Sequence, residues 1–340
     1  MTGISFLLYR LKDKDGFADQ FGIHVFTPVS IFVSKVSGIF PFSLGEMLLY
    51  AVILWFLISL IKTVIRCIRQ RSLRTAATFL CKVLSLSSSL FLIYTANCGI
   101  QYSRTSFGER EGLEVHEVSS EELKDLVTYI VEEVTAAEAQ WQEEPTQRQM
   151  REETGASMEN LGMIYSSLAG SYPLAKPFFL SRLLSVQQVT GIYSPFTVEA
   201  NYNREAPTYN LPFVMCHELA HLKGYMQEEE ANFIAFLACI HSDDAYTKYS
   251  GWLSAFVYAG NALAGADIDT YRELYAQLPE RAIEDLQENN AFWDRFEGTV
   301  SEVHEAMNDS YLKANGQEEG TKSYGQVVDL MVVWFEEGRK

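Results

Sequence analysis

The sequence has few basic residues and few cysteines for its length. Its 340 residues include 27 Lys and Arg against 44 Asp and Glu, so the formal net charge is −17. A general nucleic-acid binder needs a basic surface that releases phosphate counterions, so this class is excluded and we expect no nucleic-acid partner. Five cysteines in a chain of this length also exclude a small domain held together by a disulfide framework.

The net charge is the sum of two chemically different parts. Residues 1–105 contain 11 basic and 4 acidic residues, whereas residues 106–340 contain the other 16 and 40. The first part therefore carries +7 and the second −24. Nearly all the long apolar runs lie in the basic part. We therefore predict a domain boundary near Arg104, with an acidic domain over residues 105–340.

Two apolar runs within residues 41–104 are long enough to cross a bilayer. The first covers about 42–61 and carries one charged residue, Glu46, near its start. The second covers 83–102 and is uncharged throughout. Such runs match ~30 Å of hydrocarbon at 1.5 Å per residue, and serines in the second run can bond back to helical carbonyls. We predict a two-helix transmembrane anchor in the lipid bilayer; the alternative is a pair of buried helices in a soluble protein.

The loop between these runs predicts the orientation of the chain. Residues 62–82 contain six Lys or Arg and no acidic residue. The positive-inside rule makes this loop cytoplasmic, so both flanks lie outside. The acidic domain follows the second run directly. We therefore expect a multi-pass protein of the cell membrane whose residues 105–340 are extracytoplasmic.

Residues 1–40 fit a spanning helix less well. The run Phe21–Phe40 is apolar but is interrupted by His24, Pro28 and Lys35, and its apolar residues recur at helical spacing with serines between them. This pattern favours an amphipathic helix that lies at the membrane interface. The N-terminus lacks the basic region and the small-residue cleavage site of a signal peptide.

The acidic part is predicted to be mainly helical, with a small amount of strand. Capping-box residues at Ser119–Glu122 open a helix that reaches about Gln142. The Pro- and Gly-rich segment 170–212 contains the best strand candidate, 191–203, which is rich in β-branched and aromatic residues. Further helices are expected at about 212–223, 228–242, 247–264, 268–277, 280–289, 291–314 and 323–337. The fold class is therefore mainly α, of the α+β type.

The motif that carries chemistry is HELAH at residues 217–221, an HExxH sequence. Residues four apart share a helix face, so His217 and His221 can hold one Zn²⁺ at ~2.0–2.1 Å per nitrogen. Glu218 lies about 100° around the helix, where it can take a proton from a water bound to the metal. The alternative is a pair of histidines on a purely structural helix.

A catalytic zinc needs a third protein ligand and an open position. A metzincin would have His six residues after His221, but Gln227 stands there, so that class is excluded. A Glu from the next helix is the natural alternative. Glu228 is the first choice, because it shares a face with small alanines and with Asn232, which could bond to a ligating histidine from the second shell. Glu230 is the alternative third ligand.

Substrate-binding residues are predicted less sharply. An edge strand that pairs with an extended peptide is expected just before the HExxH helix, at Val198, Glu199, Ala200 and Asn201. A donor for the oxyanion is also expected. Tyr193, Tyr225, His241, His304 and Tyr324 are all possible, and nothing in the sequence chooses among them.

The chain resembles an uncharacterised bacterial family, the domain-of-unknown-function family DUF3810, over nearly its whole length. The resemblance is carried by PFSLGE (41–46), TGIYSPFTVEANYN (190–203), HELAH (217–221), EEEANFIAFLAC (228–239), YLKANGQ (311–317) and SYGQVVDL (323–330). It implies a membrane-anchored protein with an HExxH motif and no assigned substrate. The segment after the motif is also similar to third-ligand segments of gluzincin peptidases, which implies a zinc-ligand role for Glu228 and a supporting role for Asn232.

Together these features predict a membrane-anchored, zinc-dependent endopeptidase with a helical, zincin-like domain outside the cell. His217, His221 and Glu228 would hold Zn²⁺, Glu218 would act as the general base, and the substrate would be a peptide or protein near the membrane. Two alternatives are a non-catalytic zinc receptor or sensor for peptide or cell-wall fragments, and a structural subunit of a membrane complex. An intact Glu218 argues against a pure binder, because such a protein has no need of that carboxylate.

Overall fold

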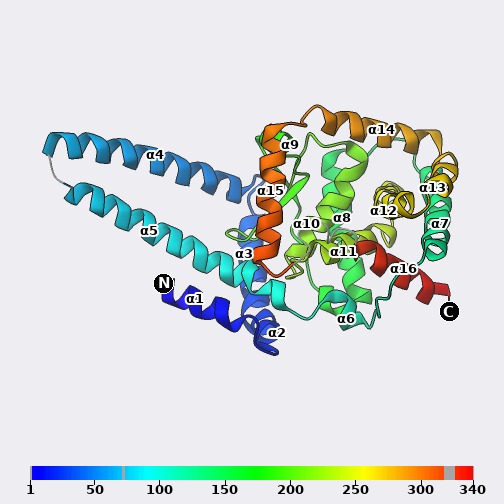
Figure 1. The fold of residues 1–340 in the computed structure, drawn as a ribbon, viewed down its shortest axis with the longest axis horizontal. Coiled ribbons are helices and arrows are strands. Elements are labelled where there is room, and N and C mark those ends of the chain that lie inside the picture. Colours follow the sequence, from blue (N-terminus) through cyan, green and yellow to red (C-terminus); the bar gives the residue numbers. More distant parts are fainter. Residues whose placement is uncertain (1, 71–72, 318–325, 340) are drawn as a thin grey trace. The chain divides into compact units, whose positions relative to one another are not determined.

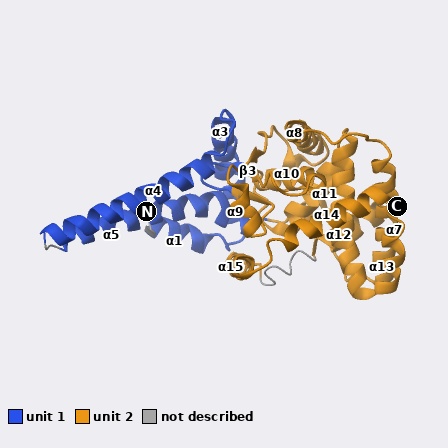
Figure 2. Ribbon diagram, turned by 90° about the horizontal axis from the view of Figure 1, so that it is seen from above, with its two compact units in different colours: residues 1–104, 194–199 blue, residues 105–193, 200–340 orange. Residues whose placement is uncertain are grey.

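The structure, a computed structural model, describes residues 2–70, 73–317 and 326–339, and the chain divides into two compact units (Figures 1 and 2). Unit 1 comprises residues 1–104 and 194–199, and unit 2 comprises residues 105–193 and 200–340. The division after Arg104 falls where the charge balance of the sequence changes sign. Helices dominate the described parts of both units, in agreement with the predicted mainly α class.

Unit 1 is built from helices that follow one another with short connections. In chain order they are α1 (Thr2–Leu11), α2 (Phe17–Phe21), a π-helical turn (Gly22–Phe26), α3 (Thr27–Gly38), α4 (Leu44–Gln70), α5 (Arg74–Tyr94), a second π-helical turn (Thr95–Gly99) and a 3₁₀ turn (Gln101–Ser103).

Three helical runs in this unit are long and apolar enough to cross a membrane, one more than the two predicted: Phe17–Gly38, Leu44–Gln70 and Arg74–Ser103. In the second and third runs none of the apolar window is buried inside the protein. In the third, Ser88 Oγ donates to the carbonyl of Leu84 at 2.7 Å, the back-bonding expected of serines in an apolar helix. These features indicate association with a membrane.

The additional run, Phe17–Gly38, has its polar side turned inward. Ser30, Ser34 and Ser37 are buried, whereas Phe32 and Ile39 are 69 % and 76 % exposed. In a soluble protein the faces would be reversed, so this arrangement suits a helix whose apolar side meets lipid.

The run Phe17–Gly38 also lies across the α4–α5 hairpin rather than along it. A Cβ on Gly22 would touch the side chain of Arg104, which follows α5, and Gly38 lies only a few residues before α4. Both of its ends are therefore at the same end of the hairpin, and α3 is steeply inclined to α4 and α5 in both views of the unit (Figures 1 and 2). The run Phe17–Gly38 is therefore long enough to cross a membrane, but its direction differs from that of the α4–α5 hairpin.

The segment 62–82, predicted as a loop, is largely helical. Helix α4 continues to Gln70 and α5 begins at Arg74, so Lys62 and Arg66 extend the first apolar helix. The physical reason is that Lys and Arg are good helix formers and residues 62–70 contain no Pro or Gly.

Unit 2 contains the remaining elements. They are α6 (Phe107–Glu111), α7 (Ser120–Glu138), α8 (Gln147–Ile164), a 3₁₀ turn (Ser166–Leu168), β1 (Lys176–Pro177), α9 (Ser181–Val186), β2 (Gly191–Ser194), β3 (Glu199–Tyr202), a 3₁₀ turn (Thr208–Asn210), α10 (Leu211–His221), α11 (Glu228–Ile240), α12 (Ala245–Ala266), α13 (Ile268–Tyr275), α14 (Glu280–Asp294), α15 (Thr299–Ala314) and α16 (Gln326–Arg339). Ser194 and Glu199, at the tip of the β2–β3 hairpin, belong to unit 1.

Helix α12 lies at the centre of the helical core of unit 2, where it packs against α7, α10, α11 and α13. An aromatic cluster joins these layers. The ring of Phe236 on α11 lies 5.2 Å from the rings of both Trp252 on α12 and Trp334 on α16. Tyr129 on α7 packs edge-on against Trp252 at 5.6 Å. Such pairs add to the apolar burial that holds the helices together.

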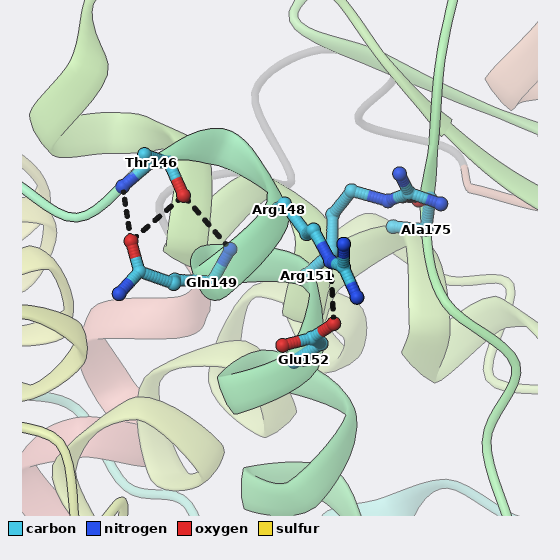
Figure 3. A network of polar contacts seen from close by, with 6 residues as sticks. All are labelled: Thr146, Arg148, Gln149, Arg151, Glu152 and Ala175. Carbon is cyan, nitrogen blue, oxygen red and sulfur yellow. Dashed lines mark hydrogen bonds and ion pairs between the residues drawn. The ribbon is translucent and has the colours of Figure 1, made fainter.

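Helix α8 was not among the predicted helices, although its start carries a clear signal. Thr146 and Gln149 form a capping box in which the backbone N–H of Thr146 donates to Gln149 Oε1 at 2.9 Å and that of Gln149 donates to Thr146 Oγ1 at 3.4 Å (Figure 3). On the next turn Arg148 pairs with Glu152 at 3.0 Å, and Arg151 donates to the carbonyl of Ala175. The T-x-x-Q pattern could have identified this helix.

The break predicted near residue 290 is wrong. Helix α14 continues to Asp294, and the next helix begins only at Thr299. The interruption occurs at Gly298, whose φ of +154° is accessible to glycine and rare for other residues. The last predicted helix agrees with α16 from Gln326 onward, and residues 323–325 lie outside the described residues.

The three-stranded sheet has the order β1-β3-β2, so β3 is its central strand. The prediction that Val198–Asn201 form an edge strand for a substrate is therefore wrong. Val198 lies in the turn before β3 with φ +49°, and Ala200 and Asn201 are buried in the middle strand. The predicted strand 191–203 is in fact a hairpin, and its first half, β2, is the strand that lies at an edge.

Glu199 has a different role, as a cap on α4. Its carboxylate accepts hydrogen bonds from the backbone N–H groups of Leu44 at 3.1 Å and Gly45 at 2.7 Å, and from Thr197 Oγ1 at 2.7 Å. Backbone N–H groups in the first turn of a helix have no partner within it, and a negative charge there is favourable. Glu199 is only 2 % exposed, so these bonds are shielded from water.

We predict that Glu199→Ala lowers the free energy of unfolding of the full-length protein by about 1–3 kcal/mol, because two partly buried backbone donors lose their acceptor. Glu199→Gln, which keeps one acceptor oxygen, should fall between this variant and the wild type. Chemical unfolding in detergent measures the effect, with the exposed Glu205→Ala as the matched control. Equal stability of Glu199→Ala and the control would refute the capping role.

Candidate metal centre

The HExxH motif lies on α10, the most deeply buried helix around the site. A 3₁₀ turn leads into it, and Pro212 occupies its first turn, where a missing N–H does no harm. The N–H of Phe213 is satisfied from outside by Ser250 Oγ on α12 at 3.2 Å. After His221 the chain turns at Gly224, whose φ of +90° suits glycine, and it then enters α11.

The two histidines point their Nε2 atoms at each other across 3.2 Å, with ring planes nearly perpendicular. The other nitrogen of each ring is held by an oxygen. His217 Nδ1 lies 2.8 Å from Asn232 Oδ1, and His221 Nδ1 lies 2.6 Å from the carbonyl of Tyr225. Oxygens accept, so each Nδ1 donates, and when both rings are neutral they present two Nε2 lone pairs to one point. A cation at that point would satisfy both.

Glu228, the first residue of α11, supplies a third ligand atom. Its Oε2 lies 3.3 Å from His217 Nε2, and both side chains are largely buried. The contact of Asn232 with His217 is made from the next turn of the same helix. Helix α11 therefore brings both a candidate ligand and the group that orients a ligand, as the face shared by these two residues predicts.

The other two glutamates of the triplet are directed elsewhere. Glu229 Oε2 accepts from Gln317 Nε2 at 2.6 Å, and Glu230 Oε1 accepts from the backbone N–H of Phe107. Successive side chains on a helix point about 100° apart, so only one of three can face the histidines. Glu230, the predicted alternative ligand, is thus committed to holding the start of α6, and Glu228 is the ligand candidate that the structure favours.

Glu218 lies beside the ligands, inside the protein. Ligand atoms of His217, Glu218 and His221 all lie within 4.8 Å of one another. Glu218 is 4 % exposed, and its Oε2 is buried without a hydrogen-bond partner in the described part of the chain. Burial raises the pKa of its carboxyl to about 8. The charge of His217 lowers this pKa, and the charge of Glu228 raises it.

The electrostatics of the site favour positive charge on the histidine next to the carboxylates. Burial alone lowers the pKa of His217, but the hydrogen bond and charge of Glu228, with help from Glu218 and Asn232, raise it to about 9. Burial and the charge of His217 lower the pKa of His221 to about 4. The two carboxylates thus stabilise one positive charge on the pair of histidines. A bound metal cation would take the place of that charge.

Strand β2 passes directly over Glu218. A Cβ on Gly191, the first residue of the strand, would lie 2.5 Å from Glu218 Oε1 and 2.8 Å from its Cγ. Only glycine allows the backbone to approach so closely. The edge strand of the sheet is therefore next to the carboxylate of Glu218, although it is β2 and not the predicted Val198–Asn201 segment.

The predicted oxyanion donors are scattered. The ring of Tyr193, on β2, lies 5.9 Å from the ring of His221. Tyr225 packs edge-on against Phe107 at 5.6 Å, and His241 Nδ1 contacts the carbonyl of Leu237 at the end of α11. His304 lies on α15. Tyr324 lies outside the described residues.

A residue that the sequence analysis missed is Tyr258 on α12. Its ring lies 6.0 Å from that of Phe213, one turn before His217 on α10. Burial raises the pKa of its hydroxyl, and the charge of Glu228 raises it further. Its position in a helix 30 residues after Glu228 gives no local signal, so only the packing of α12 on α10 reveals it.

A second group of possible ligands, His116, Glu122 and Glu336, lies at the surface. Glu122 already accepts from the backbone N–H of Ser119 at 2.7 Å as part of the capping box at the start of α7. Its carboxylate is thus engaged in helix capping. The three side chains of this group are exposed or half-buried, unlike the largely buried ring of His217.

The family model described as "Protein of unknown function (DUF3810)" matches residues 22–332. No curated protein and no solved structure matches the chain. The matched range includes every described residue of the metal centre, and its description assigns no activity.

We predict that Glu228→Gln lowers the affinity for Zn²⁺, whereas Glu230→Gln lowers the stability of the protein. Loss of the Glu228 carboxylate should weaken Zn²⁺ affinity by at least about 100-fold, because even partners of ligands change affinity by 10–100-fold. Glu230→Gln should keep the metal and lose stability instead, since an amide oxygen is a weaker acceptor for Phe107. Competition with a chelator and metal analysis measure affinity, and thermal unfolding measures stability. A metal lost only in Glu230→Gln would reverse the assignment.

Proposed function

We propose a function for this chain, which belongs to the family of proteins of unknown function DUF3810, from its own residues: it is a membrane-anchored, zinc-dependent peptidase of the zincin type. His217, His221 and Glu228 hold the metal, and Glu218 is the general base. The substrate is a peptide or protein in an extended conformation close to the membrane.

The observation that carries the proposal is the spacing of the ligand atoms. The two Nε2 atoms are 3.2 Å apart, and Glu228 Oε2 is 3.3 Å from one of them. Tetrahedral zinc with bonds of ~2.0–2.1 Å separates two of its ligand atoms by about 3.3–3.4 Å, so these two separations suit the ion. Two imidazoles and a carboxylate also suit zinc better than Mg²⁺ or Ca²⁺, which prefer oxygen ligands.

Zinc in this position would lower the pKa of a water to about 7 and polarise the carbonyl of a substrate. The protein supports that chemistry by fixing each ring through its Nδ1, so that neither imidazole can turn away. The surrounding burial keeps bulk water out and strengthens every charge interaction in the site.

Glu218 moves the proton. Its unpartnered, buried Oε2 is available to accept a proton from a water as the water oxygen bonds to the carbonyl carbon. The same carboxyl then delivers that proton to the amine nitrogen when the C–N bond breaks. One water is consumed, and a carboxylic acid and an amine are released.

Strand β2 is the proposed binding edge for the substrate backbone. An extended peptide that adds to this edge would be held by main-chain hydrogen bonds. Because Gly191 brings the strand into contact with Glu218, the peptide would run past the carboxylate that activates the water. This supports a peptide substrate more than a small molecule.

We predict that the purified full-length protein binds about one zinc per chain and cleaves casein or a peptide library. Glu218→Gln should keep the zinc and lose about 10²–10⁴-fold in kcat, because it removes only the proton acceptor. Cleavage products are detected by mass spectrometry. Equal cleavage by both proteins would remove Glu218 as the base, and zinc without any cleavage by the wild type would favour a receptor.

The proposed location of unit 2 is extracytoplasmic. Lys62, Arg66 and Arg69 at the end of α4 and Arg74 at the start of α5 form a basic turn of the hairpin, which the positive-inside rule assigns to the cytoplasm. Residue 105 then follows on the outside. We assign the run Phe17–Gly38 to the outer interface, because both of its ends lie at that end of the hairpin.

We predict opposite signals from reporters fused after residues 75 and 110. Alkaline phosphatase, active only outside, should be active at 110 and silent at 75, and a fluorescent protein that folds inside should show the reverse. The expectation follows from the basic turn between α4 and α5. A cytoplasmic signal at 110 would overturn the orientation and leave the metal chemistry unaffected.

A further inference from the structure

Helix α12 faces the metal helix with a row of hydroxyl side chains four residues apart. Ser250 Oγ accepts the N–H of Phe213 at 3.2 Å, and Ser254 Oγ donates to Asn210 Oδ1 at 3.3 Å. Tyr258 is the next member of the row. It packs its ring on Phe213 at a centroid distance of 6.0 Å. Residues four apart share a helix face, so the row brings Tyr258 to α10.

Phe213 fixes where Tyr258 lies relative to the metal centre. It is one turn before His217 on α10, and helical side chains lean toward the N-terminal turn, so the ring of His217 extends in the direction of Phe213. The negative charge of Glu228 acts on the Tyr258 hydroxyl as well. The ring contact with Phe213 therefore places the phenol on the face of α10 that carries His217.

The hydroxyl of Tyr258 differs from those of other packed tyrosines. Tyr249 donates to Asp285, Tyr172 to the carbonyl of Leu168, and Tyr202 to Gln147. Among the described residues no hydrogen bond involves the hydroxyl of Tyr258, and the side chain is only partly buried. A phenol is protonated at neutral pH, so this hydroxyl can donate a hydrogen bond to a bound substrate.

We propose that the Tyr258 hydroxyl donates a hydrogen bond to the carbonyl oxygen of the scissile peptide as that oxygen gains negative charge. This inference rests on the proposed peptidase function. When the water oxygen bonds to the carbonyl carbon, the π electrons of the C=O bond move to oxygen, and the fixed O–H dipole stabilises the charge. When the C–N bond breaks, the C=O bond re-forms; Tyr258 remains neutral throughout.

The other candidates fit this task less well. Tyr193 lies over the ring of His221, on the strand that would bind the peptide backbone, and the ring of Tyr225 is enclosed against Phe107. His241 is turned to its own helix end. Tyr258 instead packs on the helix that carries both histidines, through Phe213.

The test is Tyr258→Phe in the full-length, zinc-loaded protein. Removal of one oxyanion donor should lower kcat by about 10²–10³-fold with KM changed less than about threefold, because the bond forms mainly in the transition state. Zinc content and thermal unfolding should match the wild type. Tyr258→His, which retains a donor, should recover part of the lost rate. The matched control is Tyr275→Phe, which removes a hydroxyl from a tyrosine of α13 that packs on Phe256.

A second readout does not depend on turnover. A phosphinic peptide, whose tetrahedral anionic group mimics the oxyanion, should bind Tyr258→Phe at least about 10-fold more weakly than the wild type in calorimetry. A kcat and a phosphinate affinity equal to those of the wild type would overturn the role of Tyr258. A wild-type protein that holds zinc but cleaves no peptide would instead refute the proposed function, and the inference with it.

Discussion

The candidate metal centre depends on two hydrogen bonds that leave the Nε2 side of each imidazole free. His217 is held by Asn232 and His221 by the carbonyl of Tyr225, and both bonds use Nδ1. If either ring turned, its Nε2 would leave the point where the two lone pairs meet. Each partner comes from the segment that follows α10: the turn through Gly224 supplies the carbonyl, and α11 supplies the amide. The packing of α11 on α10 is therefore a condition of the chemistry as well as of the fold.

The three consecutive glutamates show how one helix start can serve three purposes. Glu228 faces His217, Glu229 binds Gln317, and Glu230 binds the N–H of Phe107. The spacing of about 100° per residue forces this division. The result is that the ligand at the start of α11 is braced on both sides, by the segment after α15 and by the segment that opens unit 2. A metal ligand at a helix end needs such support, because the ends of helices fray.

The sequence was informative where the signal is local and silent where it depends on packing. The HExxH spacing, the capping box at Ser119 and the shared face of Glu228 and Asn232 are properties of single helices, and all could be predicted. The order of the sheet could not, because the alternation within 191–203 does not say which half of a hairpin is paired on both sides. Tyr258 reaches the site only through the contact of α12 with α10, and no pattern within α12 marks it.

The energetics of the centre also point toward a cation. Two carboxylates and two imidazoles are buried together, and one carboxylate oxygen, Glu218 Oε2, has no partner in the described part of the chain. Such groups are costly to remove from water unless they are paired, and a stable fold gains nothing from them by itself. A purely structural helix would place apolar side chains at these positions, as α10 does at Phe213, Val214 and Met215. The cost is understandable if a divalent ion offsets it, since one ion satisfies both imidazoles and a carboxylate and leaves Glu218 beside it for the proton.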